Sequence, residues 1–502
     1  MVMRKKKKAV PMHINDITII ENQKLKKAIT AAALGNAMEW FDFGVYGFLA
    51  YVLGKVFFPD ASPSVQLVAS LATFSVPFLV RPLGGVVFGI LGDRLGRQKV
   101  LAVTIIIMSV STFAIGLIPS YASIGIWAPI LLLIAKLAQG FSVGGEYTGA
   151  AVFVAEYAPD NRRGFLGSWL DFGSIAGFVL GAGVVVLISA IVGEQDFEAW
   201  GWRIPFFIAG PLGLIGLYLR HALEETPAFQ QHVDQLTEDD KRNIKAPAKI
   251  SFKEVVRNNW QGLLVCVGLV IATNVTYYML LTYMPSYLSH NLHYSADHGV
   301  LIIIAIMCGM LFVQPIIGLL SDRFGRKPFV IGGSLGLLLL SIPCFYLINS
   351  GSVGLIFLGL LLLAVMLNCF TGVVASILPA IFPTAIRYSA MAIAFNISVL
   401  VAGFTPTAIA WLVEATQNLY MPAYYLMVVA VIGLITGLRM TETANKPLKG
   451  ATPAASSKEE AREILQAHYD HIEGRIENID EEIERLQKKR ATLVDQHPEI
   501  NH

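Results

Sequence analysis

The chain contains twelve apolar segments, each about as long as the ~20 residues that an α-helix needs to cross the hydrocarbon core of a bilayer. Of all residues 55% are apolar and only 15% are charged, whereas a soluble chain carries about 25% charged residues. A single core surrounded by water cannot hide so much apolar surface. We therefore predict an all-α membrane protein with twelve transmembrane helices, at residues 28–53, 65–91, 99–119, 127–157, 165–191, 203–220, 260–288, 299–320, 328–348, 353–381, 388–413 and 420–438.

Positive charges are distributed unevenly among the predicted loops. Most of the loop Lys and Arg residues follow the second, fourth, sixth, eighth and tenth segments, whereas the loops on the opposite side hold only Lys55 and Arg203. Because Lys and Arg concentrate in cytoplasmic loops, both termini are predicted to be cytoplasmic. The basic start, MVMRKKKKAV, is predicted to be part of a tail, since the apolar stretch that begins near Ala28 is too long for a signal peptide.

The sequence is internally doubled. GILGDRLGRQK (89–99) recurs as GLLSDRFGRKP (318–328), and PDNRRG (159–164) recurs as PTAIRY (383–388). The repeats keep the same order, which is typical of transporters built from two parallel six-helix repeats. We predict a tail (1–27), a six-helix half (28–220), a cytoplasmic linker (221–258), a second six-helix half (259–440), a linker (441–458) and a coiled-coil helix (459–497).

The doubled loop motif is predicted to act as a conformational switch. Its first glycine allows close packing at the end of a helix, and its second glycine suits the turn that reverses the chain. Its aspartate can cap the N-terminus of a neighbouring helix or pair with an arginine. The switch residues are expected to be Gly89, Asp93, Arg94, Gly96, Arg97, Gly318, Asp322, Arg323, Gly325 and Arg326.

Few charges lie well inside the predicted spans. They comprise two cations, Arg81 and Lys136, and four acids. Each buried charge costs about 2.5 kcal/mol or more, so such residues usually face a polar interior and carry function. The acids are Glu39, Asp42, Glu146 and Asp171.

Two of the four acids can pair with the two cations, and the other two have no obvious cationic partner. A carboxylate that is unpaired and away from water takes up a proton readily, so this surplus favours proton coupling. Glu39 and Asp42 are three residues apart and share one helix face, where like charges oppose double ionisation. A purely structural role in ion pairs is the alternative, and it is favoured for Asp171.

Aromatic and amide side chains crowd the middle of several spans. A quaternary ammonium binds well over aromatic faces, and amides or cations can hold a carboxylate. The candidate substrate-binding residues are Arg81, Lys136, Trp40, Tyr46, Asn274, Tyr277, Tyr278 and Asn368. The alternative for each aromatic residue is that it only packs or anchors the helix at the membrane interface.

Residues 459–497 are charged and carry a heptad pattern. Leu465, Ile472, Ile479, Leu486 and Leu493 occupy position d, and Tyr469, Ile476, Ile483 and Arg490 occupy position a. This pattern predicts a coiled-coil homodimer, with a solitary amphipathic helix as the alternative. An antiparallel pair is favoured, because Arg490 would face its own copy in a parallel one.

The sequence contains no motif that indicates metal binding, ATP hydrolysis or enzymatic catalysis. The four cysteines lie in apolar runs without metal-ligand spacing, and neither an HExxH motif nor a GxxxxGK[ST] phosphate loop is present. We therefore expect no metal, no cofactor, no enzymatic activity, no ATP-driven pump and no nucleic-acid partner.

Several strings resemble a known family. GDRLGR and SDRFGR resemble the loop signature of the major facilitator superfamily, and ALEETPAF resembles its metabolite:H⁺ symporter branch. ITAAALGNAMEWFDFGVYGF, FSVGGEYTGA and IATNVTYYMLLTYMPSYLSHNLHYS are similar to the osmosensory proline/glycine betaine symporters, as is the heptad tail. The resemblance implies proton-driven uptake of zwitterionic osmolytes across the bacterial inner membrane, activated by high osmolality. A symporter for another organic acid and a sensor without transport are the alternatives.

Overall fold

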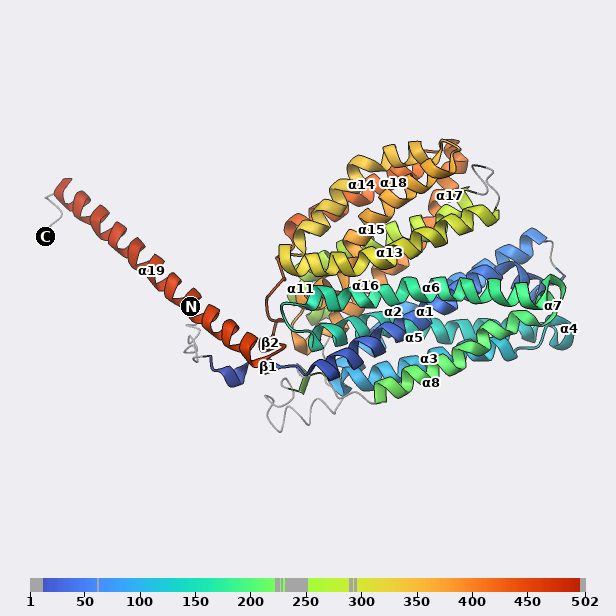
Figure 1. Cartoon of the computed structure of the whole chain (residues 1–502), viewed down its shortest axis with the longest axis horizontal. Coiled ribbons are helices and arrows are strands. Elements are labelled where there is room, and N and C mark those ends of the chain that lie inside the picture. Colours follow the sequence, from blue (N-terminus) through green and yellow to red (C-terminus); the bar gives the residue numbers. More distant parts are fainter. Residues whose placement is uncertain are drawn as a thin grey trace. The chain divides into compact units, whose positions relative to one another are not determined.

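The computed structural model describes residues 12–60, 63–221, 226, 229–230, 252–288, 292 and 296–496. The chain forms two compact units, a helical bundle (Asn22–Ala451) and a smaller unit made from the two tails. Figure 1 shows the helices of the bundle running side by side. Most of the predicted linker 221–258, the basic residues 1–8 and the end of the predicted coiled coil at 497 lie outside the described residues.

The first half of the bundle contains six long helices. They are α1 (Asn22–Phe57), α2 (Pro63–Leu95), α3 (Arg97–Leu117), α5 (Trp127–Tyr157), α6 (Arg163–Val192) and α8 (Ile204–His221). Three short elements lie between them, α4 (Tyr121–Ile124), α7 (Glu194–Ala199) and the 3₁₀ turn η2 (Gly201–Arg203). Each long helix overlaps one of the six segments expected from hydropathy.

The second half repeats this pattern with two interruptions. Its seventh span is α11 (Phe252–Tyr277), continued by the π-helical turn η3 (Tyr278–Tyr283) and α12 (Met284–Ser286). The eleventh is split into α16 (Arg387–Gly403), which follows the 3₁₀ turn η5 (Thr384–Ile386), and α17 (Thr405–Thr416). The others are α13 (Ala296–Phe324), α14 (Lys327–Ile348), α15 (Val353–Ile381) and α18 (Met421–Arg439).

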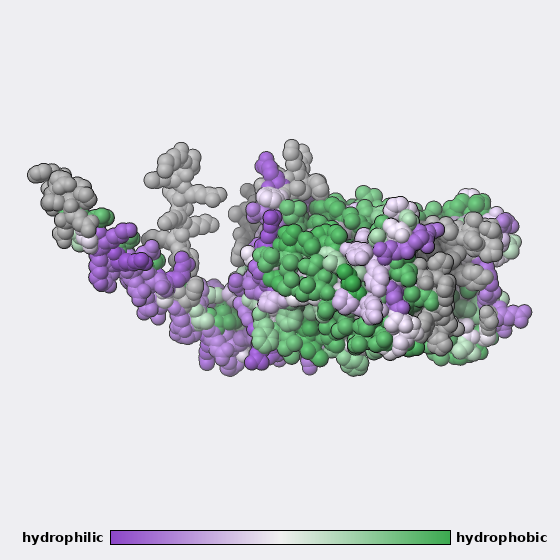
Figure 2. All heavy atoms as spheres, turned by 90° about the horizontal axis from the view of Figure 1, so that it is seen from above, coloured by the Kyte–Doolittle hydropathy of each residue, from purple (hydrophilic) through white to green (hydrophobic). Residues whose placement is uncertain are grey.

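The outside of the bundle is apolar. Within the described residues, ten helices are long and apolar enough to cross a membrane, and α1 and α8 lie at the two remaining predicted segments. Large apolar side chains such as Phe312 and Leu339 are well exposed on the bundle, and Figure 2 shows apolar residues covering much of the visible face. Exposed apolar surface of this extent needs lipid around it, which confirms the predicted membrane class.

Glycines set two local features that the sequence predicted. Gly96 and Gly325 have φ values of 100° and 92° and form the turns after α2 and α13, where an L side chain would be strained. Gly164 on α6 and Gly318 on α13 face each other so closely that a Cβ on either would meet the other's carbonyl oxygen. Small residues therefore let the two halves approach at this point.

The tail unit is built around a long helix, α19 (Lys458–Gln496). Ser457 caps its N-terminus, because the Ser457 hydroxyl accepts a hydrogen bond from the backbone N–H of Glu460 at 3.2 Å. Before it, strand β2 (Ala454–Ala455) pairs in parallel with β1 (Thr18–Ile19), which follows the 3₁₀ turn η1 (Ile14–Asp16). The predicted tail helix is thus observed, and it is joined to the N-terminal segment.

Candidate substrate and proton site

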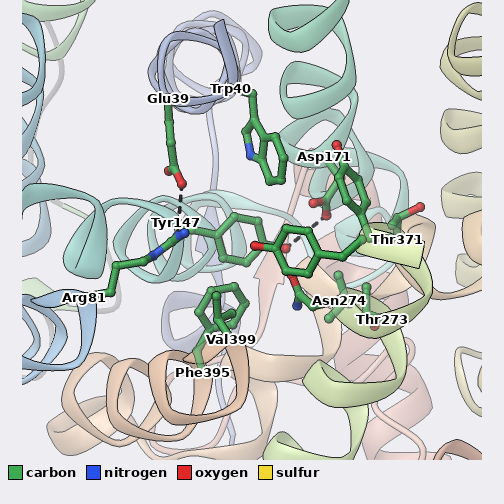
Figure 3. A pocket seen from close by; sticks show the side chains of 13 residues that line it. Glu39, Trp40, Arg81, Tyr147, Asp171, Thr273, Asn274, Thr371, Phe395 and Val399 are labelled. Carbon is green, nitrogen blue, oxygen red and sulfur yellow. Dashed lines mark hydrogen bonds and ion pairs between the residues drawn. The ribbon is translucent and has the colours of Figure 1, made fainter. Parts of the chain in front are cut away.

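A cavity lies between the two halves of the bundle (Figure 3). Helices α1, α2, α5 and α6 supply one wall, and α11, η3, α15 and α16 supply the other. The lining residues are Glu39, Trp40, Arg81, Tyr147, Asp171, Thr273, Asn274, Tyr277, Tyr278, Thr371, Val374, Phe395 and Val399. Because both halves contribute, a solute bound here touches both parts of the molecule.

An ion pair between α1 and α2 borders this cavity. The Arg81 Nη2 atom lies 3.0 Å from Glu39 Oε1, and the two side chains are only 4% and 1% exposed. In the described part of the chain, Arg81 Nε and Glu39 Oε2 are buried without a hydrogen-bond partner, and so is the Tyr277 hydroxyl. Buried polar groups are normally satisfied, so these three atoms are available to a polar ligand.

Asp171 sits on the same cavity in a different environment. Its Oδ2 accepts a hydrogen bond of 3.0 Å from the Tyr147 hydroxyl, drawn as a dashed line in Figure 3. Within the described residues no Lys or Arg forms an ion pair with it. Tyr147 in turn stacks on Phe395 of the other half, with ring centroids 4.6 Å apart and planes 15° apart.

Two neighbouring tyrosines line the cavity where α11 passes into a π-helical turn. Tyr277 ends α11 and Tyr278 begins η3, and such π-helical turns are frequent at functional sites. Tyr277 packs against Trp40 with centroids 4.8 Å apart, and Tyr278 packs edge-on against Phe78. The cavity therefore has an aromatic wall made from both halves.

A second buried network lies outside the cavity lining. Lys136 Nζ is 3.0 Å from Asp42 Oδ2 and 4.0 Å from the centre of the Tyr46 ring. The Gln139 amide donates to Asp42 Oδ1 at 3.0 Å and to the Thr112 hydroxyl at 2.6 Å. Asp42, Lys136 and Tyr46 are therefore brought together, but they do not line the cavity.

Two further candidates also lie beyond the lining. Glu146 is buried on α5 without being part of the cavity wall. Asn368 accepts a hydrogen bond of 3.3 Å from the hydroxyl of Thr371, which does line the cavity. The sequence-based candidates that share the cavity are thus Glu39, Trp40, Arg81, Asp171, Asn274, Tyr277 and Tyr278.

The switch motifs join the halves at the end of the bundle where α1 begins and α18 ends. Asp93 accepts hydrogen bonds from the backbone N–H groups of Tyr388 and Ser389 at 3.1 and 2.8 Å. In the same way Asp322 accepts from Gly164 and Phe165 at 2.6 and 2.7 Å. Each acid thus caps a helix that belongs to the opposite half, as the motif led us to expect.

Arginines of the motifs strengthen these caps. Arg97 lies 3.3 Å from Asp93, and Arg326 lies 3.4 Å from Asp322. Arg97 also pairs with Glu156 on α5 at 3.3 Å, and Glu156 pairs with Arg387 on α16 at 2.5 Å. Sequence reasoning missed Glu156, although an acid inside the predicted span 127–157 was a visible signal.

The segment that follows α18, residues 442–449, crosses the same end of the bundle. Arg163 donates to the carbonyl of Lys446 at 2.9 Å, and Arg387 donates to the carbonyl of Lys449 at 2.8 Å. Glu442 accepts from the backbone N–H groups of Arg326 and Lys327 at 3.1 and 3.0 Å. These contacts tie the segment to both halves while this end is closed.

Glu442 lies outside the spans, and its charge is stabilised. Partial burial works to raise the pKa of Glu442, but hydrogen bonds from the backbone N–H groups of Ala444, Lys327, Arg326 and Thr443 hold it below the usual value. The N-terminus of α14 is therefore capped by an ionised carboxylate.

Within the described ranges no group of three or more His, Cys, Asp or Glu side chains is placed to hold a metal ion. Cys266, Cys308, Cys344 and Cys369 are free thiols.

Comparison with known proteins agrees with this architecture. The family described as "Sugar (and other) transporter" matches residues 28–455, and the one described as "Osmosensory transporter coiled coil" matches residues 456–501. The proline/betaine transporter of Salmonella typhimurium is 74% identical over 499 residues, which are 99% of this chain and 100% of that protein. The glycine betaine/proline/ectoine/pipecolic acid transporter OusA of Dickeya dadantii is 73% identical over 497 residues, 99% of each chain.

A solved structure shares the fold. The proton:xylose symporter XylE superimposes with a TM-score of 0.72 at 20% sequence identity, covering 89% of this chain and 100% of that one. The predicted major facilitator fold is therefore confirmed. The family model and the relatives show that the chain is a transporter and not an enzyme. It belongs to the family described as "Sugar (and other) transporter".

Proposed function

We propose that this protein imports proline, glycine betaine and similar zwitterionic osmolytes by proton symport across the bacterial inner membrane, and that high osmolality activates it. The observation that carries the proposal is the cavity shared by both halves, which combines a cation, acids and an aromatic wall. Of the two relatives at 73–74% identity, one is named as a proline/betaine transporter and the other as a glycine betaine/proline/ectoine/pipecolic acid transporter.

The cavity fits the two ends of a zwitterion. The unpartnered Arg81 Nε and Tyr277 hydroxyl can donate to the solute's carboxylate. A cationic nitrogen is favoured over the faces of Trp40 and Tyr277. One cation in the lining suits one carboxylate, whereas a multiply charged anion would need more.

The ion pair of Arg81 with Glu39 suggests how solute and proton are coupled. A solute carboxylate that binds Arg81 competes with Glu39 for the guanidinium. A Glu39 carboxylate that loses its partner in a buried site favours its protonated form. Asp171 offers a second proton site, since its neighbour is a neutral tyrosine. Asp42 and Glu146 remain candidates that lie outside the cavity lining.

Transport follows alternating access, in which the two halves rock about the cavity. The caps at Asp93 and Asp322, together with the ion pairs of Glu156 with Arg97 and Arg387, close one end of the bundle. We assign this end to the cytoplasm, because the Lys and Arg residues of the loops gather there. For the solute to leave into the cell, these contacts must break. The tail helix acts outside this path, and through its a and d positions it joins two copies of the chain.

Flux measurements with reconstituted protein test the proposal. Proteoliposomes are given labelled proline or glycine betaine, with and without an inward proton gradient, at two osmolalities. We expect uphill uptake that needs the gradient and rises at high osmolality. Absence of any solute flux would indicate a sensor, and flux of a different organic acid alone would indicate another symporter.

A further inference from the structure

The start of the tail helix, up to Tyr469, already has a partner inside the chain. Ile17 of the N-terminal segment is buried together with Ala455 and Ala461, and Leu465 packs against this cluster. Leu465 is the first d position of the heptad pattern. The next a position, Tyr469, donates from its hydroxyl to the carbonyl of Met12 at 2.8 Å.

Backbone pairing fixes this arrangement. The N–H of Thr18 donates to the carbonyl of Pro453, and the N–H of Ile20 donates to the carbonyl of Ala455, both at 2.9 Å. The strand is short, but it comes with buried apolar side chains, since Ile17 and Ile20 are 5% and 4% exposed. Apolar burial and backbone hydrogen bonds thus act on the same few residues.

The apolar side chains of the later heptads are exposed. Ile476, Ile479, Ile483, Leu486 and Leu493 are each about half exposed. An apolar stripe of this length on a charged helix indicates a partner helix. The tail therefore presents two surfaces, one covered by the chain's own N-terminal segment and one that is open.

We propose that residues 12–20 are a built-in docking partner for the start of α19, up to Tyr469. A second copy of the chain then contacts only the heptad positions from Ile472 onward. The docked segment ends directly before Asn22, where α1 begins. Helix α1 carries Glu39 and Trp40, so the docked segment links the base of the tail helix to the helix that lines the transport cavity. The statement on the second copy rests on the proposed homodimer, whereas the docking itself does not.

Disulfide cross-linking tests the docking. In a full-length chain whose four native cysteines are replaced and whose uptake is first verified, Ile17→Cys is combined with Ala461→Cys. We expect a disulfide within one chain, which mixing with isotope-labelled protein and mass spectrometry identify. Ile17→Cys with Ile476→Cys is the matched control and should give at least tenfold less product. Equal yields, or links that form mainly between chains, would overturn the docking.

Two substitutions at d positions separate the two surfaces. Leu465→Glu should reduce the 17–461 disulfide at least tenfold and leave the dimer fraction in vesicles, counted by single-molecule photobleaching, unchanged. Ile479→Glu should abolish the dimer and leave the disulfide intact. Loss of the dimer to the same extent in Leu465→Glu would contradict the division of the tail. If no variant dimerises, the proposed homodimer fails, and the cross-link alone decides the docking.

Discussion

Arg81 and Glu39 form an ion pair in which each side chain keeps one buried polar atom without a partner. An isolated structural ion pair is most stable when all its polar atoms are satisfied. The incomplete pair at the cavity wall is therefore suited to exchange a protein partner for a solute. This relationship underlies the first prediction.

Replacement of Arg81 by Gln should weaken solute binding. The substitution removes the cation that we assign to the solute's carboxylate, and a charged hydrogen bond contributes about 1.5–3 kcal/mol. We expect the KM for glycine betaine in counterflow to rise at least tenfold. Arg203→Gln, which changes an arginine away from the cavity, should have little effect on KM. Unchanged KM in Arg81→Gln would rule out this assignment.

Two tyrosines give a matched comparison of hydroxyl groups. Tyr277 and Tyr283 both have a buried hydroxyl without a partner, but only Tyr277 lines the cavity. Tyr277→Phe should raise the KM for proline severalfold, because a donor to the solute is lost. Tyr283→Phe should leave KM unchanged, since its hydroxyl does not reach the solute. Equal effects of the two substitutions would show that Tyr277 acts only through packing.

Asp171→Asn should separate transport from proton coupling. Asparagine keeps the shape of the side chain but cannot take up a proton. We expect solute exchange to persist while accumulation driven by a pH gradient falls at least tenfold. Tyr147→Phe, which removes the hydroxyl that donates to Asp171, should shift the pH dependence of uptake without abolishing it. Full uphill uptake by Asp171→Asn would exclude it as an essential proton site.

Loss of a helix cap should open the closed end of the bundle. Asp322→Asn weakens the hydrogen bonds to the N-terminus of α6, and a cap contributes about 1 kcal/mol. We expect a cysteine placed at Ser168, which lies against Gly318, to be alkylated about fivefold faster. Asp93→Asn removes the corresponding cap at the same end and should have a similar effect. Unchanged alkylation rates in both variants would contradict this role of the caps.

The pH dependence of stability should reveal the cap by Glu442. Its pKa is lowered in the folded chain, so its contribution to stability is present above the usual value near 4.5 and is lost as the pH falls through the lowered pKa. The Tm of Glu442→Gln should therefore be below that of the unaltered protein at pH 7, and the difference should shrink below pH 4.5. A Tm difference that is independent of pH would contradict an ionised cap.

Counting charges in the predicted spans found the charged residues of the cavity lining, Glu39, Arg81 and Asp171. Arg81, Lys136, Glu39 and Asp42 are all buried and paired, because isolated charges in an apolar segment are costly. The same count included Asp171 but gave no sign of Tyr147 or Phe395, which act through contacts between helices. It also omitted Glu156, since that acid lies near the end of its span.

The sequence by itself determined the membrane class, the two repeated halves, the turns at Gly96 and Gly325 and the heptad tail. These features follow from local composition and spacing, which bilayer thickness, helix geometry and backbone sterics constrain directly. Only the tertiary structure decided which acid meets which cation, that Tyr277 and Tyr278 line one cavity, and that the N-terminal segment packs against Leu465. Those outcomes depend on contacts between residues far apart in the chain, and no local pattern encodes which of several possible partners packs best.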